Sequence, residues 1–239
     1  MPHRRFNSDQ AARHLHLTRA ELDALVRAGE VPCEKIGDRV QFQPHELSAW
    51  ASQRLLNMTP QRVREYHRET TVRQHDLSRD HRLMPELVAP EFVNAAFPAK
   101  TRAGVIRDLV AWANRTGKVV YPEDLRRGVE ERERQCSTAL GGGIAMLHPT
   151  HHEPYQFEDS FILLARATQP IPFGSPDGQT TDLFFLVCSQ EERLHLHLLA
   201  RLCAMCYHTD LILRLHEAAD AATMRAALLA AEESVVRQA

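Results

Sequence analysis

The sequence predicts a layered α/β domain preceded by a small module of short helices. Continuous apolar runs at 161–165 and 183–187 are typical of buried strands, and residues on either side of them show helical apolar spacing. Helices that alternate with buried strands favour an α/β or α+β layered domain. Closely spaced helix caps and a hairpin signal near the N-terminus predict the separate module.

Composition places the chain among folded proteins. It has 239 residues, of which 44% are hydrophobic and 25% charged, so it can bury a core. No apolar run approaches the roughly 20 residues that a membrane helix needs, and the polar start does not resemble a secretory signal. Five cysteines without framework spacing fit a reducing compartment. We therefore expect a cytoplasmic protein without membrane insertion.

Short elements follow one another in the N-terminal module. Thr18 and Glu21 form a capping-box pattern, and Gly29 is a left-handed cap for the helix that follows Thr18. Gly37 and Asp38 predict a tight hairpin turn between strands at 33–36 and 39–42. The two remaining expected helices are 10–14, capped by residues 7–9, and one that begins at Pro44.

This order of helix, turn, helix, hairpin and helix resembles the excisionase-type winged helix-turn-helix, a MerR-like DNA-binding module, over residues 6–54. The matching motifs are Ala11–Leu15, Thr18–Leu22, Leu25–Pro32, Ile36–Phe42 and Leu47–Trp50. The resemblance implies that the helix after Thr18 enters the major groove, with Arg19 and Arg27 near DNA. It also implies that the hairpin is the wing, with Lys35 and Arg39 near phosphates. A helical adaptor with solvated arginines is the alternative.

Residues 57–82 are polar and rich in arginine. We expect a solvated linker that builds no core; a basic arm along DNA or a dimerising helix is the alternative. The predicted domains are therefore a helix-turn-helix domain at 1–56, the linker at 57–82 and an α/β domain at 83–239.

A glycine-rich turn at 141–143 leads into a short apolar run that ends at His148. This pattern predicts a strand that carries an imidazole to the surface of the protein. A neutral imidazole nitrogen is nucleophilic at pH 7, so histidine suits reversible capture of a phosphoryl group.

The segment from 131 to 149 resembles enzyme IIA of the fructose, mannitol and nitrogen-regulatory class of the bacterial phosphoenolpyruvate-dependent phosphotransferase system. The matching motifs are Arg132-Glu133, Ser137-Thr138, Gly141–Ala145, Met146 and His148, followed by blocks at 172–186 and 195–200.

The enzyme IIA resemblance implies a mixed sheet flanked by helices, and it assigns a role to each matched site residue. His148 would accept a phosphoryl group on Nε2 from the phosphohistidine of an HPr-like carrier. His195 would contact the phosphoryl oxygens or orient the ring, Arg132 would add positive charge, and Ser137 and Thr138 would supply hydroxyl contacts. No metal or other cofactor is implied.

Two residues depart from this family pattern. The family has proline before the active histidine and a small residue after it, whereas this chain has Leu147 and Pro149. Pro149 removes a backbone donor, so a slower acceptor or an inert sensor is an alternative, and metal binding is a weaker one.

Three further expectations concern histidine and cysteine. We expect His151 and His152 in an exposed loop, His195 and His197 on different faces of one helix, and Cys203 and Cys206 as buried structural residues.

The resulting hypothesis is a DNA-binding regulator that reports the phosphorylation state of a phosphotransfer chain. The alternative is a phosphorelay component, or an unphosphorylated protein-docking sensor, with no direct DNA role. A homodimer is compatible with either interpretation.

Overall fold

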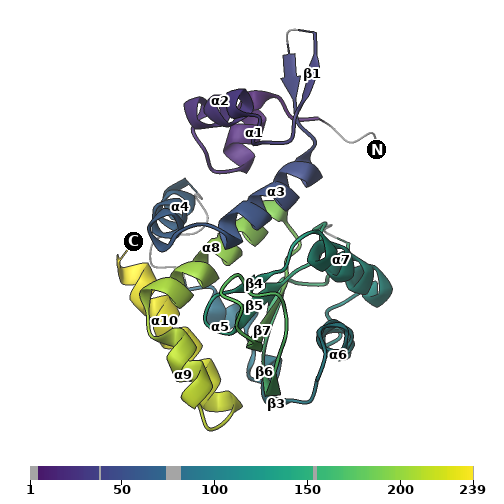
Figure 1. The fold of residues 1–239 in the computed structure, drawn as a ribbon, viewed down its shortest axis with the longest axis vertical. Coiled ribbons are helices and arrows are strands. Elements are labelled where there is room, and N and C mark those ends of the chain that lie inside the picture. The colour runs from purple at the N-terminus through teal and green to yellow at the C-terminus, as the bar shows by residue number, and fades with distance from the viewer. Residues whose placement is uncertain (1–4, 38, 74–81, 153–154, 239) are drawn as a thin grey trace.

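The computed structural model describes residues 5–37, 39–73, 82–152 and 155–238. A five-stranded sheet forms the centre of the larger, C-terminal part of the chain, in the order β3-β6-β7-β5-β4. Figure 1 shows helices on both sides of this sheet and the N-terminal elements gathered at one end of the molecule. The mixed α/β prediction is confirmed.

The central strands come from the apolar runs. β6 (Phe161–Ile171) and β7 (Thr181–Cys188) pair antiparallel, and almost every residue of β7 is buried. β5 (Ile144–Leu147) lies parallel to β7, and β4 (Ala139–Leu140) pairs with β5 at one edge. β3 (Val93–Phe97) lies parallel to β6 at the other edge. Strands covered on both faces have no polar face, which explains their continuous hydrophobicity.

Helices cover the two faces of the sheet (Figure 1). α6 (Arg102–Arg115) and α7 (Pro122–Gln135) lie on one side, and α7 begins with a proline, which suits the first turn of a helix. α8 (Glu192–His208), α9 (Leu211–Glu217) and α10 (Ala221–Gln238) lie on the other side. Two short turns, α5 (Met84–Leu87) and a 3₁₀ turn (Pro90–Phe92), lead into β3. Within the described ranges, no helix is long and apolar enough to cross a membrane.

The N-terminal elements occur in the predicted order. They are α1 (Ser8–His14), α2 (Arg19–Ala28), the antiparallel pair β1 (Glu34–Ile36) and β2 (Arg39–Gln41), and α3 (Pro44–Leu56). Thr18 and Glu21 form the capping box, and Gly29 ends α2 with φ of 70°. Asp38, predicted in the hairpin turn, lies outside the described residues.

This module packs directly on α8. Leu196 of α8 is fully buried within the apolar core of the N-terminal module rather than that of the α/β domain. On α3, the Ser48 hydroxyl donates a hydrogen bond to Glu192 at 2.8 Å, and the buried His14 ring lies 2.7 Å from Ser48 Oγ. The first turns of α8 therefore belong to both parts of the protein.

The expectation that 57–82 is a solvated linker does not hold for its first half. Residues 60–73 form α4 (Pro60–Arg73), and Val63 and Tyr66 are buried in the main core. The helix faces α8, where the Thr70 hydroxyl is 3.0 Å from Nδ1 of His197. The linker prediction failed here because α4 has only a narrow apolar stripe. Polar contacts with α8 supply the rest of its packing. Residues 74–81 of the expected linker lie outside the described part of the chain.

A buried ion pair joins this region to α10. Arg201 donates to Glu232 at 2.9 Å and, through Nε, to His67 Nε2 at 2.7 Å. Glu232 also accepts hydrogen bonds from the backbone amides of Leu83 and Met84. One carboxylate thus ties α8, α10 and the start of α5 together, because each buried polar atom needs a partner.

Cys203 and Cys206 are buried and free, as predicted. Burial raises the pKa of both thiols, so they are unreactive packing residues of α8.

Candidate functional site

His148 lies at the carboxyl end of β5, as the sequence predicts. Gly142 and Gly143 precede the strand with φ of 83° and 79°, a conformation that favours glycine. Four buried residues, 144–147, then hold the strand between β4 and β7. The histidine is therefore presented by one of the most tightly packed strands of the sheet.

The hydrogen bonds of His148 define its tautomer. Nδ1 lies 2.9 Å from the carbonyl oxygen of Met146, which can only accept, so Nδ1 carries the proton. Nε2 accepts a hydrogen bond from Nε of Arg132 at 3.1 Å. Burial, with the adjacent Arg132 charge, lowers the pKa of His148 well below its ordinary value. The ring is thus neutral at pH 7, with its lone pair on Nε2, the nitrogen expected to attack phosphorus.

Two more histidine rings complete a cluster with His148. The ring of His195, in the first turns of α8, lies 4.7 Å from that of His148 between centroids. His152 stacks on His195 at 3.7 Å. The expectation that His152 is an exposed loop residue is wrong, because its side chain is 6% exposed and packs inside the cluster. His151 is half-buried and lies against His45 of α3.

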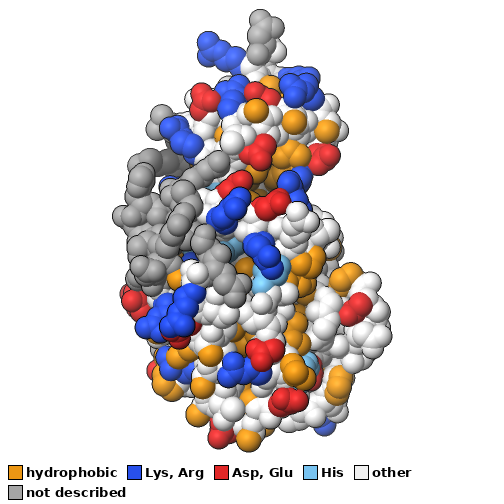
Figure 2. All heavy atoms as spheres, turned by 90° about the vertical axis from the view of Figure 1, so that its left-hand side faces the viewer, with side chains coloured by type: hydrophobic (Ala, Val, Ile, Leu, Met, Phe, Trp, Pro, Cys, Tyr) orange, Lys and Arg blue, Asp and Glu red, His pale blue; other side chains and the backbone are white. Residues whose placement is uncertain are grey.

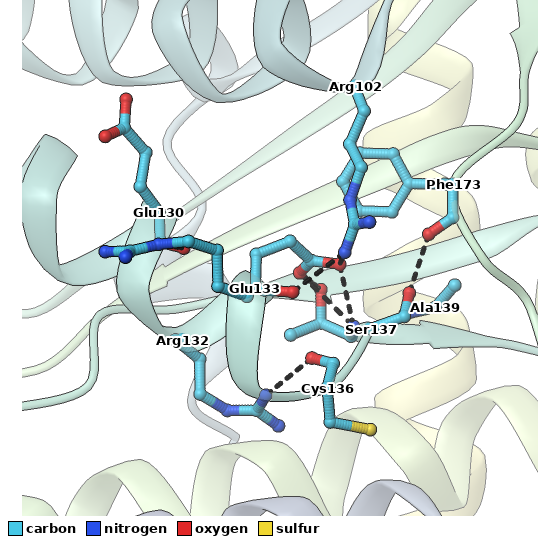
Figure 3. A network of polar contacts seen from close by, with 10 residues as sticks. Arg102, Glu130, Arg132, Glu133, Cys136, Ser137, Ala139 and Phe173 are labelled. Atoms are coloured by element: carbon cyan, nitrogen blue, oxygen red, sulfur yellow. Dashed lines mark hydrogen bonds and ion pairs between the residues drawn. The ribbon is translucent and has the colours of Figure 1, made fainter.

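Arg132 comes from α7 and is 1% exposed. Its Nη1 donates to the carbonyl oxygen of Cys136 at 2.8 Å (Figure 3). Its Nη2 is buried and has no hydrogen-bond partner among the described residues. Burial lowers the pKa of the guanidinium, yet arginine remains a cation in proteins. A buried positive charge with an unused donor therefore lies beside Nε2 of His148.

Unpartnered polar atoms gather around His148. Besides Arg132 Nη2, the described residues leave both ring nitrogens of His195 and Nδ1 of His152 buried without a partner. Each such atom costs about 1–3 kcal/mol, so folded proteins keep few of them. Several in contact indicate a site built to surround a polar group. A tetrahedral oxyanion attached to Nε2 would give acceptors to Arg132 Nη2 and to the one N–H of the neutral His195 ring.

Ser137 and Thr138 do not join this cluster through their hydroxyl groups. The Ser137 hydroxyl donates to the carbonyl oxygen of Phe173 at 2.7 Å, and the Thr138 hydroxyl donates to Glu133 at 2.6 Å. The Glu133 carboxylate also forms an ion pair with Arg102. Figure 3 shows the side chain of Glu133 directed away from that of Arg132. In this structure the two hydroxyls belong to a network that connects the end of α7 to β4.

The site is closed to solvent in this structure. His148 is 1% exposed and His195 is 0% exposed, whereas the sequence predicted an imidazole at the surface. The N-terminal module contacts the surrounding elements, with His45 against His151 and Ser48 against Glu192. A single sequence cannot reveal this closure, because the covering elements are distant in the chain.

Pro149 is fixed against α7. The carbonyl oxygen of Gly128 accepts hydrogen bonds from both the backbone amide and the hydroxyl of Thr150. A Cβ on Gly128 would lie 3.0 Å from that of Pro149, so the absence of a side chain on Gly128 allows this close approach. The segment after His148 is therefore held rigidly, and Pro149 offers no amide to the site.

The four residues expected to contact DNA lie outside the histidine cluster. Arg27, Lys35 and Arg39 are exposed on α2 and on the strand pair. Arg19 is ion-paired with Asp9 at 2.7 Å and with Asp23 at 3.0 Å, so its charge is already engaged within the module.

Nowhere in the described ranges is there a group of three or more metal-binding side chains with the geometry to hold an ion. His195 and His197 face different sides of α8, as predicted: His195 meets the cluster and His197 meets α4.

Acidification below about pH 6.5 is expected to destabilise the protein. Burial lowers the pKa of His14 to about 4 and those of His67 and His152 to about 3. At pH values between these lowered pKa values and the ordinary pKa of 6.5, the three histidines bind protons in the unfolded chain but not in the folded one. The free energy of unfolding should fall by up to about 1.4 kcal/mol per pH unit per histidine.

Urea unfolding at a series of pH values would measure this effect, and His152→Asn should make the dependence shallower. A midpoint that stays constant from about pH 7 to 5 would contradict neutral buried rings.

The fold and the site define a class of protein: an α/β domain that presents a neutral, buried histidine beside an arginine and a second histidine. Residues 86–231 match the family described as "Phosphoenolpyruvate-dependent sugar phosphotransferase system, EIIA 2". The chain therefore belongs to the EIIA type 2 family of that system.

Two curated proteins are similar to more than half of this chain. The "Nitrogen regulatory protein" of Bradyrhizobium diazoefficiens is 32% identical over 142 residues, which cover 57% of this chain and 88% of that protein. The "PTS system fructose-specific EIIABC component" of Bacillus subtilis is 26% identical over 135 residues. That match covers 56% of this chain but only 21% of the longer protein.

Solved structures show the same fold. Nitrogen regulatory protein IIA-Ntr from Neisseria meningitidis aligns with a TM-score of 0.56 at 21% identity, covering 62% of this chain and 99% of that structure. IIA mannitol from Escherichia coli aligns with a TM-score of 0.52 at 19% identity, covering 59% and 98%. These alignments cover nearly all of each solved chain but only about 60% of this one.

Proposed function

We propose that this chain is a cytoplasmic phosphorelay component in which Nε2 of His148 accepts a phosphoryl group from the phosphohistidine of an HPr-like carrier. The observation that carries the proposal is a neutral histidine whose lone pair is on Nε2, beside a guanidinium Nη2 and a second imidazole ring that are buried without partners among the described residues. In the transfer, Nε2 forms a bond to phosphorus while the phosphorus–nitrogen bond to the carrier breaks.

The surrounding groups would act by position and charge. Arg132 now donates to Nε2 itself, so it must turn toward the phosphoryl oxygens as the new bond forms. Nη2 of Arg132 and the one N–H of the neutral His195 ring supply further donors, because preorganised donors stabilise developing charge in a dry site. Since His148 is closed off, the elements that cover it must move before a carrier can reach Nε2.

Incubation of the full chain with phosphoenolpyruvate, enzyme I and an HPr-like carrier tests this proposal. Mass spectrometry should show one added phosphoryl group, labile in acid and stable in base, on His148. His148→Ala should abolish it, whereas His208→Ala, at the far end of α8, should not. Absence of the group in wild-type protein under these conditions would exclude the relay.

The second candidate is a docking sensor that is never phosphorylated. It is favoured by the 1% exposure of His148 and by the hydrogen bond that occupies Nε2. The phosphorylation experiment separates the two, since a sensor binds its partner without taking up phosphate.

A DNA-binding role for residues 6–54, with regulation of transcription, remains a separate proposal. Exposed Arg27, Lys35 and Arg39 on a helix and hairpin of the expected order support it, whereas the ion pairs of Arg19 weaken it. If the module binds phosphates, a triple alanine variant of the three exposed residues should weaken salt-dependent binding of the full chain to duplex DNA. Identical salt-dependent retention of variant and wild type would exclude these contacts.

A further inference from the structure

A cavity of about 380 Å³ lies between the N-terminal module and α4. Its walls come from α2 and α3 on one side and from α4 on the other, and its apolar lining includes Leu15, Leu25, Trp50 and Met58. Figure 2 shows hydrophobic side chains between red and blue charged groups in the hollow below the N-terminal module. This volume falls within the range of about 300–1,000 Å³ that is typical of small-molecule sites.

One residue that lines the cavity has a polar atom without a partner among the described residues. Tyr66 of α4 lines the cavity, its side chain is 8% exposed, and its hydroxyl is buried without a hydrogen bond. Tyrosine hydroxyls that are buried usually find a partner, since an unmade hydrogen bond is costly. An occupant that reached the Tyr66 hydroxyl would therefore supply the hydrogen bond that this group lacks among the described residues.

The charged residues at the cavity are mostly acidic. They are four glutamates and two arginines: Glu21, Glu30, Glu65, Glu69, Arg54 and Arg62. Arg54 pairs with Glu30 at 3.0 Å, and Arg62 pairs with Glu65 at 3.3 Å. Glu69 joins none of the ion pairs formed by the described residues. Among the described lining residues, four carboxylates stand against two guanidinium groups, so the rim carries net negative charge.

We propose that this cavity binds a small organic cation with an apolar or aromatic body. The body would lie against the apolar lining beside Trp50, a hydrogen-bond acceptor would meet the Tyr66 hydroxyl, and the positive end would lie near Glu69. Carboxylates at the rim of an apolar pocket attract a cation and repel an anion of the same shape. The site is separate from His148, and the proposal does not depend on phosphorylation.

A matched pair of probes tests the charge requirement. 4-Methoxyphenethylamine has an aromatic body, an ether oxygen and an ammonium group, and 4-methoxyphenylacetate replaces the ammonium with a carboxylate. The chain has two tryptophans, so Trp112→Phe leaves Trp50 as the reporter for fluorescence titration of the full, unphosphorylated protein. The amine should quench or shift Trp50 emission saturably and bind at least about tenfold more tightly than the acid.

Variants then assign the contacts. Tyr66→Phe removes only the hydroxyl and should weaken amine binding by about two- to tenfold. Glu69→Gln should reduce the preference for the amine, whereas Glu217→Gln, exposed on α9, should leave it unchanged. Ala28→Phe would fill the cavity and should abolish binding.

Three outcomes would overturn the proposal. The first is no saturable response to the amine, and the second is equal binding of amine and acid. The third is a change in Trp50 emission with protein concentration alone, because a second copy of the chain would then occupy the cavity.

Discussion

Replacing Glu232 by alanine is expected to lower the free energy of unfolding by about 3–5 kcal/mol. Glu232 and its partner Arg201 are both 0% exposed, so the variant leaves a buried guanidinium without its counter-charge. The same change removes the acceptor for the amides of Leu83 and Met84. Because these contacts join α8, α10 and α5, the loss should affect the whole domain. Urea unfolding followed by circular dichroism measures it.

The adjacent Glu233 provides a matched control. It lies on the same helix but its side chain is 40% exposed, and it pairs with Arg237 at the surface. Exposed pairs contribute about 0–1 kcal/mol, so Glu233→Ala should change stability little. Glu232→Gln keeps one carbonyl acceptor and should fall between the two variants. Equal unfolding midpoints for the two alanine variants would show that the buried pair does not stabilise the fold.

Replacing Arg132 by methionine is expected to slow phosphoryl uptake by His148 at least about tenfold, given the proposed function. Removing one donor to a developing oxyanion typically costs about 10²- to 10³-fold in rate. Part of that loss is offset, because the variant also frees Nε2 from the hydrogen bond that now occupies it. The charge effect should dominate, since the guanidinium has a second, unused donor at Nη2. Quench-flow or timed mass spectrometry with the HPr-like carrier measures the rate.

Arg134→Met is the control for this change. Arg134 lies on the same helix, α7, but is exposed to solvent. The Arg134→Met variant should therefore take up phosphate on His148 at the wild-type rate. Arg132→Lys keeps the charge but loses the planar pair of donors, and should give an intermediate rate. A methionine variant at position 132 that folds normally and reacts as fast as wild type would remove Arg132 from the mechanism.

Local patterns in the chain were sufficient for much of the fold. The apolar runs of β6 and β7, the Thr18–Glu21 capping box and the glycine turn before β5 each act within a few residues. They therefore leave a readable pattern. The choice of Nε2 as the attacking nitrogen of His148 came only from the family resemblance, and the hydrogen bonds to Met146 and Arg132 that set its tautomer are seen only in the structure.

Contacts between distant segments could not be predicted from such local patterns. His152 carries no sign of its stacking on His195, since the two residues are brought together only by the ends of β5 and α8. Likewise, α4 has only a narrow apolar stripe, and its partners Arg201 and His197 lie more than a hundred residues further along the chain.

By itself, the sequence determined the strands and caps of the fold and a histidine in the setting of an EIIA domain, because each depends on neighbours in the chain. Only the tertiary structure decided that this histidine is enclosed, that three imidazole rings form one cluster, and that a cavity separates α2 from α4. The physical reason is that burial and unpartnered polar atoms depend on which surfaces meet, and those surfaces come from segments that are far apart in the chain.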